Sequence, residues 1–100
     1  MSVNTGNGSE TEAPLVSGSI GIYPNPVDDK FMLQVNNELT GSLKVQIVNL
    51  QGTVVKQFNL NKTNTGTSQF YLTIGELPTG QYILNATMKD WTLSQQLIRQ

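Results

Sequence analysis

The chain contains no cysteine and no histidine among its 100 residues. Disulfide bonds, thiolate nucleophiles and zinc sites built from cysteine and histidine are therefore excluded. Ser-His-Asp and Cys-His catalytic arrangements are excluded for the same reason. These absences remove the commonest routes to catalysis.

Charge is also scarce, because charged residues make up 13% of the chain and the formal net charge is −1. The six basic residues are scattered rather than clustered: Lys30, Lys44, Lys56, Lys62, Lys89 and Arg99. Nucleic-acid binding needs a concentrated basic surface, as does electrostatic docking to an anionic membrane. We expect neither kind of partner.

Long apolar runs are missing as well, since none approaches the roughly 18 residues that would cross a bilayer. The first 20 residues lack the basic start and the apolar stretch of roughly 7–15 residues that a secretory signal peptide needs. If the protein is exported, we expect its signal to lie upstream in a longer parent chain, with Met1 as an expression start.

The N-terminal segment is polar, with Val3, Leu15 and Val16 as its only sizeable apolar residues before Ile20. Such a segment buries too little surface to offset the entropy lost on ordering it. We therefore expect a flexible linker over residues 1–19, followed by one domain over residues 20–100.

Alternation of apolar and polar residues dominates the rest of the chain and is clearest at Leu43, Val45 and Ile47. Runs of this kind recur at roughly 8–12-residue spacing, with no helical period. They cover residues 20–23, 31–35, 43–47, 53–60, 70–74, 82–88 and 91–99. About seven short strands predict an all-β fold, an immunoglobulin-like antiparallel β-sandwich, with a small closed barrel as the alternative.

The stretch from Gly75 to Tyr82 separates two of these strands and contains Leu77, Pro78 and Gly80. Proline fixes its own φ and glycine permits a positive φ, so the stretch predicts a sharp turn. A tyrosine that opens the next strand is typical of a tyrosine corner, whose hydroxyl binds a backbone group upstream. We expect that group within residues 75–77; an ordinary loop before a core tyrosine is the alternative.

Other turns punctuate the chain. The two prolines of Tyr23-Pro-Asn-Pro26 cannot donate to a strand ladder, so the strand before them must lie at a sheet edge or end there. Asn49-Leu-Gln-Gly52 predicts a type I turn with a left-handed glycine, and Lys89-Asp90 predicts a tight turn. Residues 61–68 predict a polar loop.

Carboxylates offer little chemistry. Asp28 and Asp29 are adjacent and point to opposite sides of an extended segment, while Glu38, Glu76 and Asp90 each stand alone in a predicted turn. A calcium site at Asp28 and Asp29 lacks the spacing that would support it. We expect no enzyme activity, no cofactor and no small-molecule substrate.

Tyr71 and Trp91 are the aromatic residues most able to lie outside the core, where they could stack on sugars. The favoured interpretation for Trp91 is that it caps one end of the sandwich. An exposed edge beside Tyr23-Pro-Asn-Pro26 could accept an added strand.

Several of these motifs occur together in the order found in one family. They are Ile22-Tyr-Pro-Asn-Pro26, the alternating Phe31–Val35, Val45–Gly52 followed by Val54 and Val55, Leu72–Leu84 with its Leu-Pro-Thr-Gly-Gln-Tyr, and a closing strand. Over residues 20–100 the chain resembles the C-terminal sorting domain of proteins exported by the type IX (Por) secretion system of Bacteroidetes.

The resemblance implies a role beyond what composition shows. The domain would be the last part of a larger secreted protein and would fold as a seven-stranded immunoglobulin-like sandwich. Outer-membrane translocon components would recognise it, and a surface peptidase would often remove it in exchange for lipopolysaccharide attachment. The domain would be the substrate of these steps and never the catalyst, and its protein would pass through the periplasm to the cell surface.

The last strand departs from the family pattern, which usually ends in a basic, β-branched strand after a glycine-containing turn. Here the turn is Lys89-Asp90-Trp91, and Arg99 is the only basic residue in the strand. Family signals are thought to act through this strand, and the candidates here are Trp91, Leu93, Leu97, Ile98 and Arg99. The structural motif residues are Tyr23, Pro24, Asn25, Pro26, Gly52, Leu77, Pro78, Gly80 and Tyr82.

The sequence therefore predicts a non-catalytic sorting module that carries an upstream cargo domain to the cell surface. The alternative is an immunoglobulin-like accessory domain of a secreted multidomain protein that binds glycan or protein, or acts as a spacer.

Overall fold

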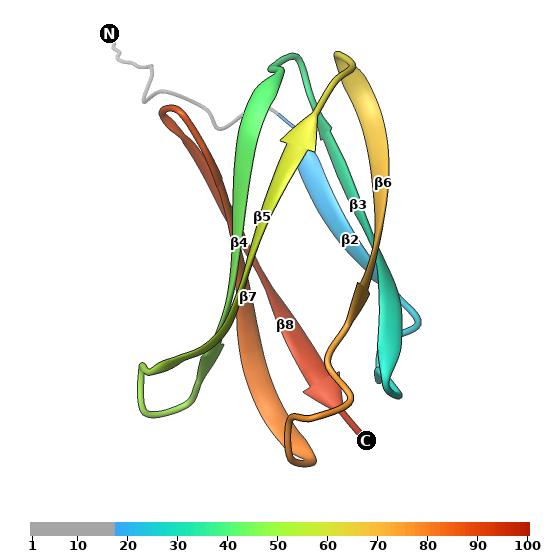
Figure 1. Ribbon diagram of the computed structural model, residues 1–100, viewed down its shortest axis with the longest axis vertical. Helices are drawn as coiled ribbons and strands as arrows, with labels where there is room; N and C mark the ends of the chain where they lie inside the picture. The colour runs from blue at the N-terminus through green and yellow to red at the C-terminus, as the bar shows by residue number, and fades with distance from the viewer. Residues whose placement is uncertain (1–17) are drawn as a thin grey trace, which may run out of the picture.

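The computed structural model describes residues 18–100 and contains seven strands in two antiparallel sheets (Figure 1). One sheet has three strands in the order β2-β3-β6, formed by β2 (Ser19–Tyr23), β3 (Lys30–Asn37) and β6 (Gly66–Thr73). The other has four strands in the order β5-β4-β7-β8, formed by β5 (Val54–Lys62), β4 (Gly41–Asn49), β7 (Gly80–Met88) and β8 (Trp91–Arg99). The predicted sandwich is confirmed, and the closed barrel is wrong.

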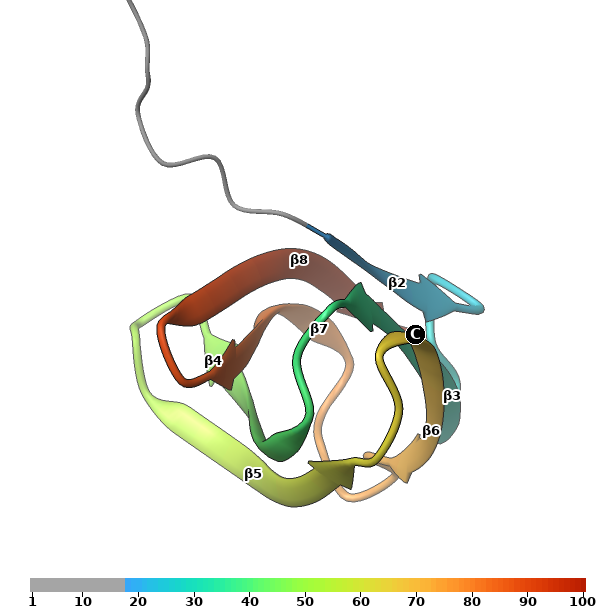
Figure 2. The ribbon, with the colours of Figure 1, turned by 90° about the horizontal axis from the view of Figure 1, so that it is seen from above.

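The two sheets face each other, as the view from above shows (Figure 2), and one hydrophobic core lies between them. Inward positions alternate with outward ones along each strand, which is why the period-two pattern identified the core. The three-stranded sheet contributes Ile22, Phe31, Leu33, Val35 and Leu72. The four-stranded sheet contributes Leu43, Val45, Ile47, Tyr82, Leu84, Ala86, Met88, Trp91 and Leu97.

Three connections pass from one sheet to the other: β3 to β4, β5 to β6, and β6 to β7. The connections alternate between the two ends of the sandwich. The β2–β3, β4–β5 and β6–β7 connections lie at the end that also holds the C-terminus (Figure 1). The N-terminal end of β2 lies at the opposite end, so the start of β2 and the C-terminus are separated by the length of the sandwich (Figure 1).

The predicted turns are largely as expected. Gly52 has a φ of 90°, its N–H donates to the carbonyl of Asn49 at 3.0 Å, and β5 follows as the hairpin partner of β4. Lys89 and Asp90 join β7 to β8 in a two-residue turn, and Lys89 has a φ of 48°. Left-handed backbone is what such tight hairpins need.

Two predictions need correction or fall outside the described residues. The loop predicted over residues 61–68 is much shorter, because β5 extends to Lys62 and β6 begins at Gly66. The linker predicted over residues 1–19 lies almost entirely outside the described residues, and β2 begins at Ser19. None of residues 18–100 forms a helix suited to crossing a membrane.

Candidate functional site

The last strand, β8, is the element on which the two sequence motifs converge. Its inner edge pairs with β7, where Gly80 lies opposite Arg99 and Tyr82 lies opposite Leu97. The segment that contains Leu-Pro-Thr-Gly-Gln-Tyr therefore runs beside the C-terminal half of β8. This is the half in which the sorting-signal candidates are concentrated.

The outer edge of the same half is covered by residues that follow the Tyr-Pro-Asn-Pro motif. Val27 is fully buried and forms a parallel bridge with Arg99. Its N–H donates to the carbonyl of Ile98 at 2.6 Å, and its carbonyl accepts from the N–H of Gln100 at 2.9 Å. After β2 ends at the prolines, the chain thus crosses to the other sheet and pairs with its last strand.

Asn25 extends this contact with its side chain. Its Nδ2 donates to the carbonyl of Gln96 at 2.9 Å, and its Oδ1 accepts from the N–H of Ile98 at 3.1 Å. An amide side chain has the same donor and acceptor groups as a peptide bond, so Asn25 occupies the position of a neighbouring strand. Residues 25–27 are called the edge segment below.

Arg99 ties the end of β8 to a third segment. Its Nη2 donates to the carbonyl of Gly75 at 3.3 Å, and its Nη1 lies 4.0 Å from a carboxylate oxygen of Asp28. Gly75 belongs to the β6–β7 connection, which lies beside the C-terminus in Figure 1. The only basic residue of the last strand therefore bridges the connections on both sides of it.

The tyrosine corner is present, with one correction. The Tyr82 side chain is buried in the core, and its hydroxyl donates to the carbonyl of Pro78 at 2.6 Å. The prediction that the acceptor lies within residues 75–77 is wrong by one residue. Leu77 is buried beside it, and its N–H donates to the carbonyl of Ile74, which closes the turn.

Gly80 has a positive φ of 159°, as the sequence allows for a glycine, at the extended end of that range. A Cβ at this position would meet no atom within 4 Å, so the backbone angle rather than a lack of space favours glycine here.

The sorting-signal candidates do not present a row of exposed side chains. Trp91 and Leu97 are buried in the core, and Leu93, Ile98 and Arg99 are half-buried. Trp91 lies at the start of β8 and is 7% exposed, so it is not available for stacking on a sugar. A partner that touches folded β8 meets its polar positions Thr92, Ser94 and Gln96, or its main chain.

The carboxylates do not assemble into a catalytic or metal site. Asp28 and Asp29 lie in the β2–β3 connection, whereas Glu38 and Asp90 lie in connections at the other end of the sandwich (Figure 1). Within residues 18–100, no three acidic, cysteine or histidine residues are grouped in a way that could hold a metal ion.

Glu76, in the β6–β7 connection, forms an ion pair with Lys56 of β5. A hydrogen bond from Lys56 lowers the pKa of the Glu76 carboxyl below its ordinary value. Lys56 also lies 5.4 Å from the centre of the Phe58 ring, on its own strand. The pair links β5 to the β6–β7 connection on the surface.

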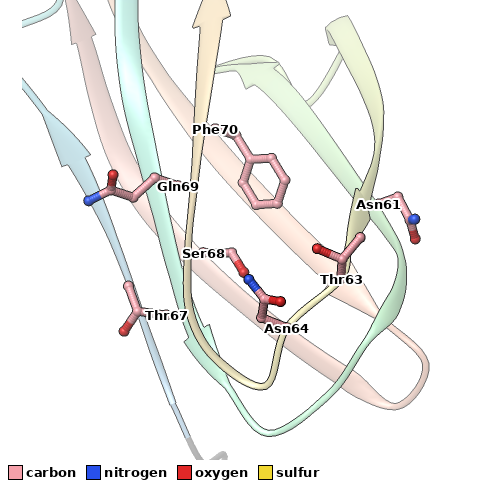
Figure 3. Close-up of a pocket in the computed structure, with 7 residues that line it drawn as sticks. All are labelled: Asn61, Thr63, Asn64, Thr67, Ser68, Gln69 and Phe70. Carbon is pink, nitrogen blue, oxygen red and sulfur yellow. The ribbon is translucent and has the colours of Figure 1, made fainter.

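A hollow of about 320 Å³ lies between the end of β5 and the start of β6 (Figure 3). It is lined by amide and hydroxyl side chains and one ring, from Asn61, Thr63, Asn64, Thr67, Ser68, Gln69 and Phe70. Figure 3 shows Thr67 and Gln69 pointing away from Asn64 and Ser68, so the polar groups do not converge. None of these side chains titrates near neutral pH, and the hollow has no acid–base pair.

Lys62 was missed by sequence reasoning. It is fully buried, and its amino group donates to the carbonyls of Asn37 at 3.2 Å, Leu39 at 3.1 Å and Asn64. The signal was present, because Phe58 and Leu60 set an inward period of two that reaches Lys62. No comparable pattern in the sequence indicates the contacts of Asn25 with β8.

Comparison with known proteins agrees with this geometry. Residues 21–100 match the family described as the secretion system C-terminal sorting domain of Por secretion. The chain is also 32% identical over 72 residues to an ulvan lyase from Nonlabens ulvanivorans. That similarity covers 72% of this chain and 12% of the lyase, so the chain spans a small part of that relative.

The match includes both the edge segment and the tyrosine corner and runs to the last residue. Type IX sorting domains occur on secreted, cell-surface proteins, as the resemblance implied. The chain belongs to the family of secretion system C-terminal sorting domains.

Proposed function

We propose that this domain is a non-catalytic module that directs a larger secreted protein through the periplasm, across the outer membrane and to the cell surface. The observation that carries the proposal is the position of residues 93–100, which lie between Tyr82 on one edge and Asn25 and Val27 on the other. Both motifs that characterise the sequence thus act on the same strand end.

The proposed partners are the outer-membrane translocon and a surface peptidase, with an upstream cargo domain in the same parent chain. The ulvan lyase supports the cargo part, because its matched stretch is 12% of a longer protein. In these steps the domain is bound and cut by other proteins. The scattered carboxylates and the absence of histidine agree with a domain that performs no chemistry of its own.

The recognised part is proposed to be the C-terminal half of β8 in its folded position. Both edges of this half are already paired, with β7 on one side and the edge segment on the other, so a partner would reach it through its side chains or by displacing the edge segment. Leu93 and Leu97 hold the strand against the core, while Ile98 and Arg99 lie at the surface end.

The test fuses residues 1–100 behind a reporter that is exported to the periplasm of a Bacteroidetes strain with type IX secretion. Protease accessibility on whole cells measures surface delivery. We expect the intact fusion at the surface and a fusion that lacks residues 93–100 in the periplasm. Surface delivery of the truncated fusion would contradict the proposal.

Truncation also removes part of the core, so a folded variant is needed as well. The double substitution Ile98→Ser and Arg99→Gln changes two half-buried positions and leaves Leu97 in place. The variant loses the contact of Arg99 with Gly75 but should remain folded at the growth temperature, as thermal unfolding would show, while surface delivery falls. Lys44→Gln, an exposed change on β4, is the matched control and should be delivered normally.

A further inference from the structure

The outward face of the three-stranded sheet carries a single row of large apolar side chains. Tyr23 of β2 is paired with Met32 of β3, and Met32 is paired with Tyr71 of β6. Tyr23 is 54% exposed and Tyr71 is 79% exposed. Since neighbouring strands lie about 4.8 Å apart, the two tyrosines start about 10 Å from each other across the sheet.

The ring of Tyr23 lies back over its own strand. A Cβ added at Gly21 would lie 2.9 Å from the ring and from the hydroxyl of Tyr23. The ring therefore lies over Gly21, and the rest of its surface faces solvent. A tyrosine has few rotatable bonds and loses little conformational entropy when a ligand stacks on it.

Polar rows flank the aromatic row on both sides. On one side Gly21, Gln34 and Gln69 are paired across the three strands, and on the other side Lys30 is paired with Thr73. A hollow of about 260 Å³ lies over the row, and its lining includes Tyr23, Pro24, Lys30, Met32, Tyr71 and Thr73. Lys30 is the only charged residue in that lining, which contains no carboxylate.

The size of the row argues against a second copy of this chain as its occupant. A stable interface buries roughly 800 Å² on each partner around an apolar centre. Here the outward positions beyond the row are small or polar: Ser19, Asn36 and Thr67 form the next row after the glutamines. The apolar surface is therefore a row that is one residue wide along the strands and runs across all three of them.

A chain of sugars fits this surface better. Sugar rings present flat C–H faces to aromatic rings and hydroxyl groups to their sides, and amide and hydroxyl side chains pair with those hydroxyls. The positive charge of Lys30 and the absence of carboxylates in the hollow favour a sugar that carries carboxylate or sulfate groups.

We propose that the face formed by Tyr23, Met32 and Tyr71 binds an acidic polysaccharide, with the two tyrosines stacking on its sugar rings and Lys30 facing its acidic groups. This function is distinct from sorting, because Met32 and Tyr71 lie on the sheet that does not contain β8. It would give the secreted protein a surface on which to hold a charged glycan.

The test titrates the 100-residue chain with soluble hexasaccharides and follows binding by NMR or calorimetry. The acidic probes are oligogalacturonate and oligoalginate, and the neutral probes are cellohexaose and xylohexaose. We expect saturable binding of at least one acidic probe in the millimolar range or tighter, with the neutral probes at least about fivefold weaker.

Tyr71→Ala should weaken binding by about tenfold or more, whereas Tyr71→Phe should retain it because the ring is kept. Lys30→Gln should reduce the preference for the acidic probe over its neutral counterpart. Leu50→Ala is the matched control, since Leu50 is an exposed apolar residue at the tip of the β4–β5 hairpin, and it should bind as the native chain does.

Three results would overturn the proposal. One is no saturable binding of either acidic probe. Another is binding that Tyr71→Ala leaves unchanged, which would indicate non-specific attraction. The third is self-association of the chain that depends on Tyr71, with no sugar binding, which would identify a second copy as the occupant. Normal sorting of the Tyr71→Ala fusion would distinguish a failure here from a failure of the proposed function.

Discussion

The two edge strands of the four-stranded sheet, β5 and β8, are protected from further strand pairing in different ways. Along β5 two lysines occupy positions of the inward-facing set: Lys56, whose amino group pairs with Glu76 at the surface, and Lys62, buried against three carbonyls. Along β8 the edge is covered instead by the edge segment, through Asn25 and Val27.

The two edges show two ways to prevent another strand from pairing with the main-chain groups at the edge of a sheet. A strand added to β5 would have to desolvate the partly exposed Lys56–Glu76 pair, which discourages the addition. Among residues 18–100, no main-chain hydrogen bond reaches the free edge of β5, whereas the edge segment makes two to β8. The C-terminal half of β8 therefore has no free main-chain ladder, and an extended partner would have to displace the edge segment to bind there.

The largest expected effect lies at the β5 edge. Lys62→Met should lower the free energy of unfolding by about 2–4 kcal/mol, because three carbonyls lose their donor in a buried site. Chemical denaturation measures the loss. Lys44→Met, at an exposed position on β4, is the control and should change little. Equal losses in both variants would show that the buried contacts of Lys62 contribute nothing particular.

The next effect tests the β8 edge. Asn25→Ala should cost about 1–3 kcal/mol, since it removes one hydrogen bond to Gln96 and one from Ile98. Hydrogen exchange should localise the change to the amides of Ile98 and Gln100. The amide of Leu97 faces β7 by the alternation of the ladder and should keep its protection. Uniform loss along β8 would mean that the edge segment does not act locally.

A smaller effect is expected at the corner that supports the inner edge of β8. Tyr82→Phe should cost about 1–2 kcal/mol, because the carbonyl of Pro78 loses its donor while the ring stays in the core. Tyr71→Phe removes the same hydroxyl from an exposed position and should have almost no effect on the unfolding midpoint. If the two variants are equally stable, the corner hydrogen bond is not a stabilising contact.

The smallest effect concerns pH and the other end of β5. Because Lys56 lowers the pKa of Glu76 in the folded state, their contact stabilises the fold above about pH 4.5 and is lost as pH falls below that value. Glu76 is exposed, so the contribution is small and weakens with salt. Melting temperatures of native and Glu76→Gln chains should differ at neutral pH and converge in acid. A difference that persists in acid would rule out the ion pair as its cause.

The local alternation of apolar and polar residues was sufficient to predict the strands and most turns, because burial of alternate side chains follows directly from strand geometry. Leu43, Val45 and Ile47 show this, and so does the hairpin closed at Gly52. Lys62 shows the limit of the local pattern. It occupies an inward position of the alternation along β5, but its charge favoured the prediction of a loop, and it is in fact fully buried. Only the carbonyls brought together from residues 37, 39 and 64 make its burial possible.

The candidate site, too, was predictable from the sequence only in part. The sequence identified the two motifs and the last strand, but it gave no reason to place Asn25 against Gln96 and Ile98, which are about 70 residues away. The sequence named Trp91 and Tyr71 as aromatic residues able to lie outside the core and favoured Trp91 as a cap of the sandwich; the structure buries Trp91 and exposes Tyr71.

By itself, the sequence determined an all-strand sandwich without the side chains for common catalysis, because composition and period-two burial are local properties. Tertiary structure alone decided that both motifs meet on one strand end and that Tyr23, Met32 and Tyr71 align across a sheet. The physical reason is register: which residues lie opposite each other is set by pairing between distant strands.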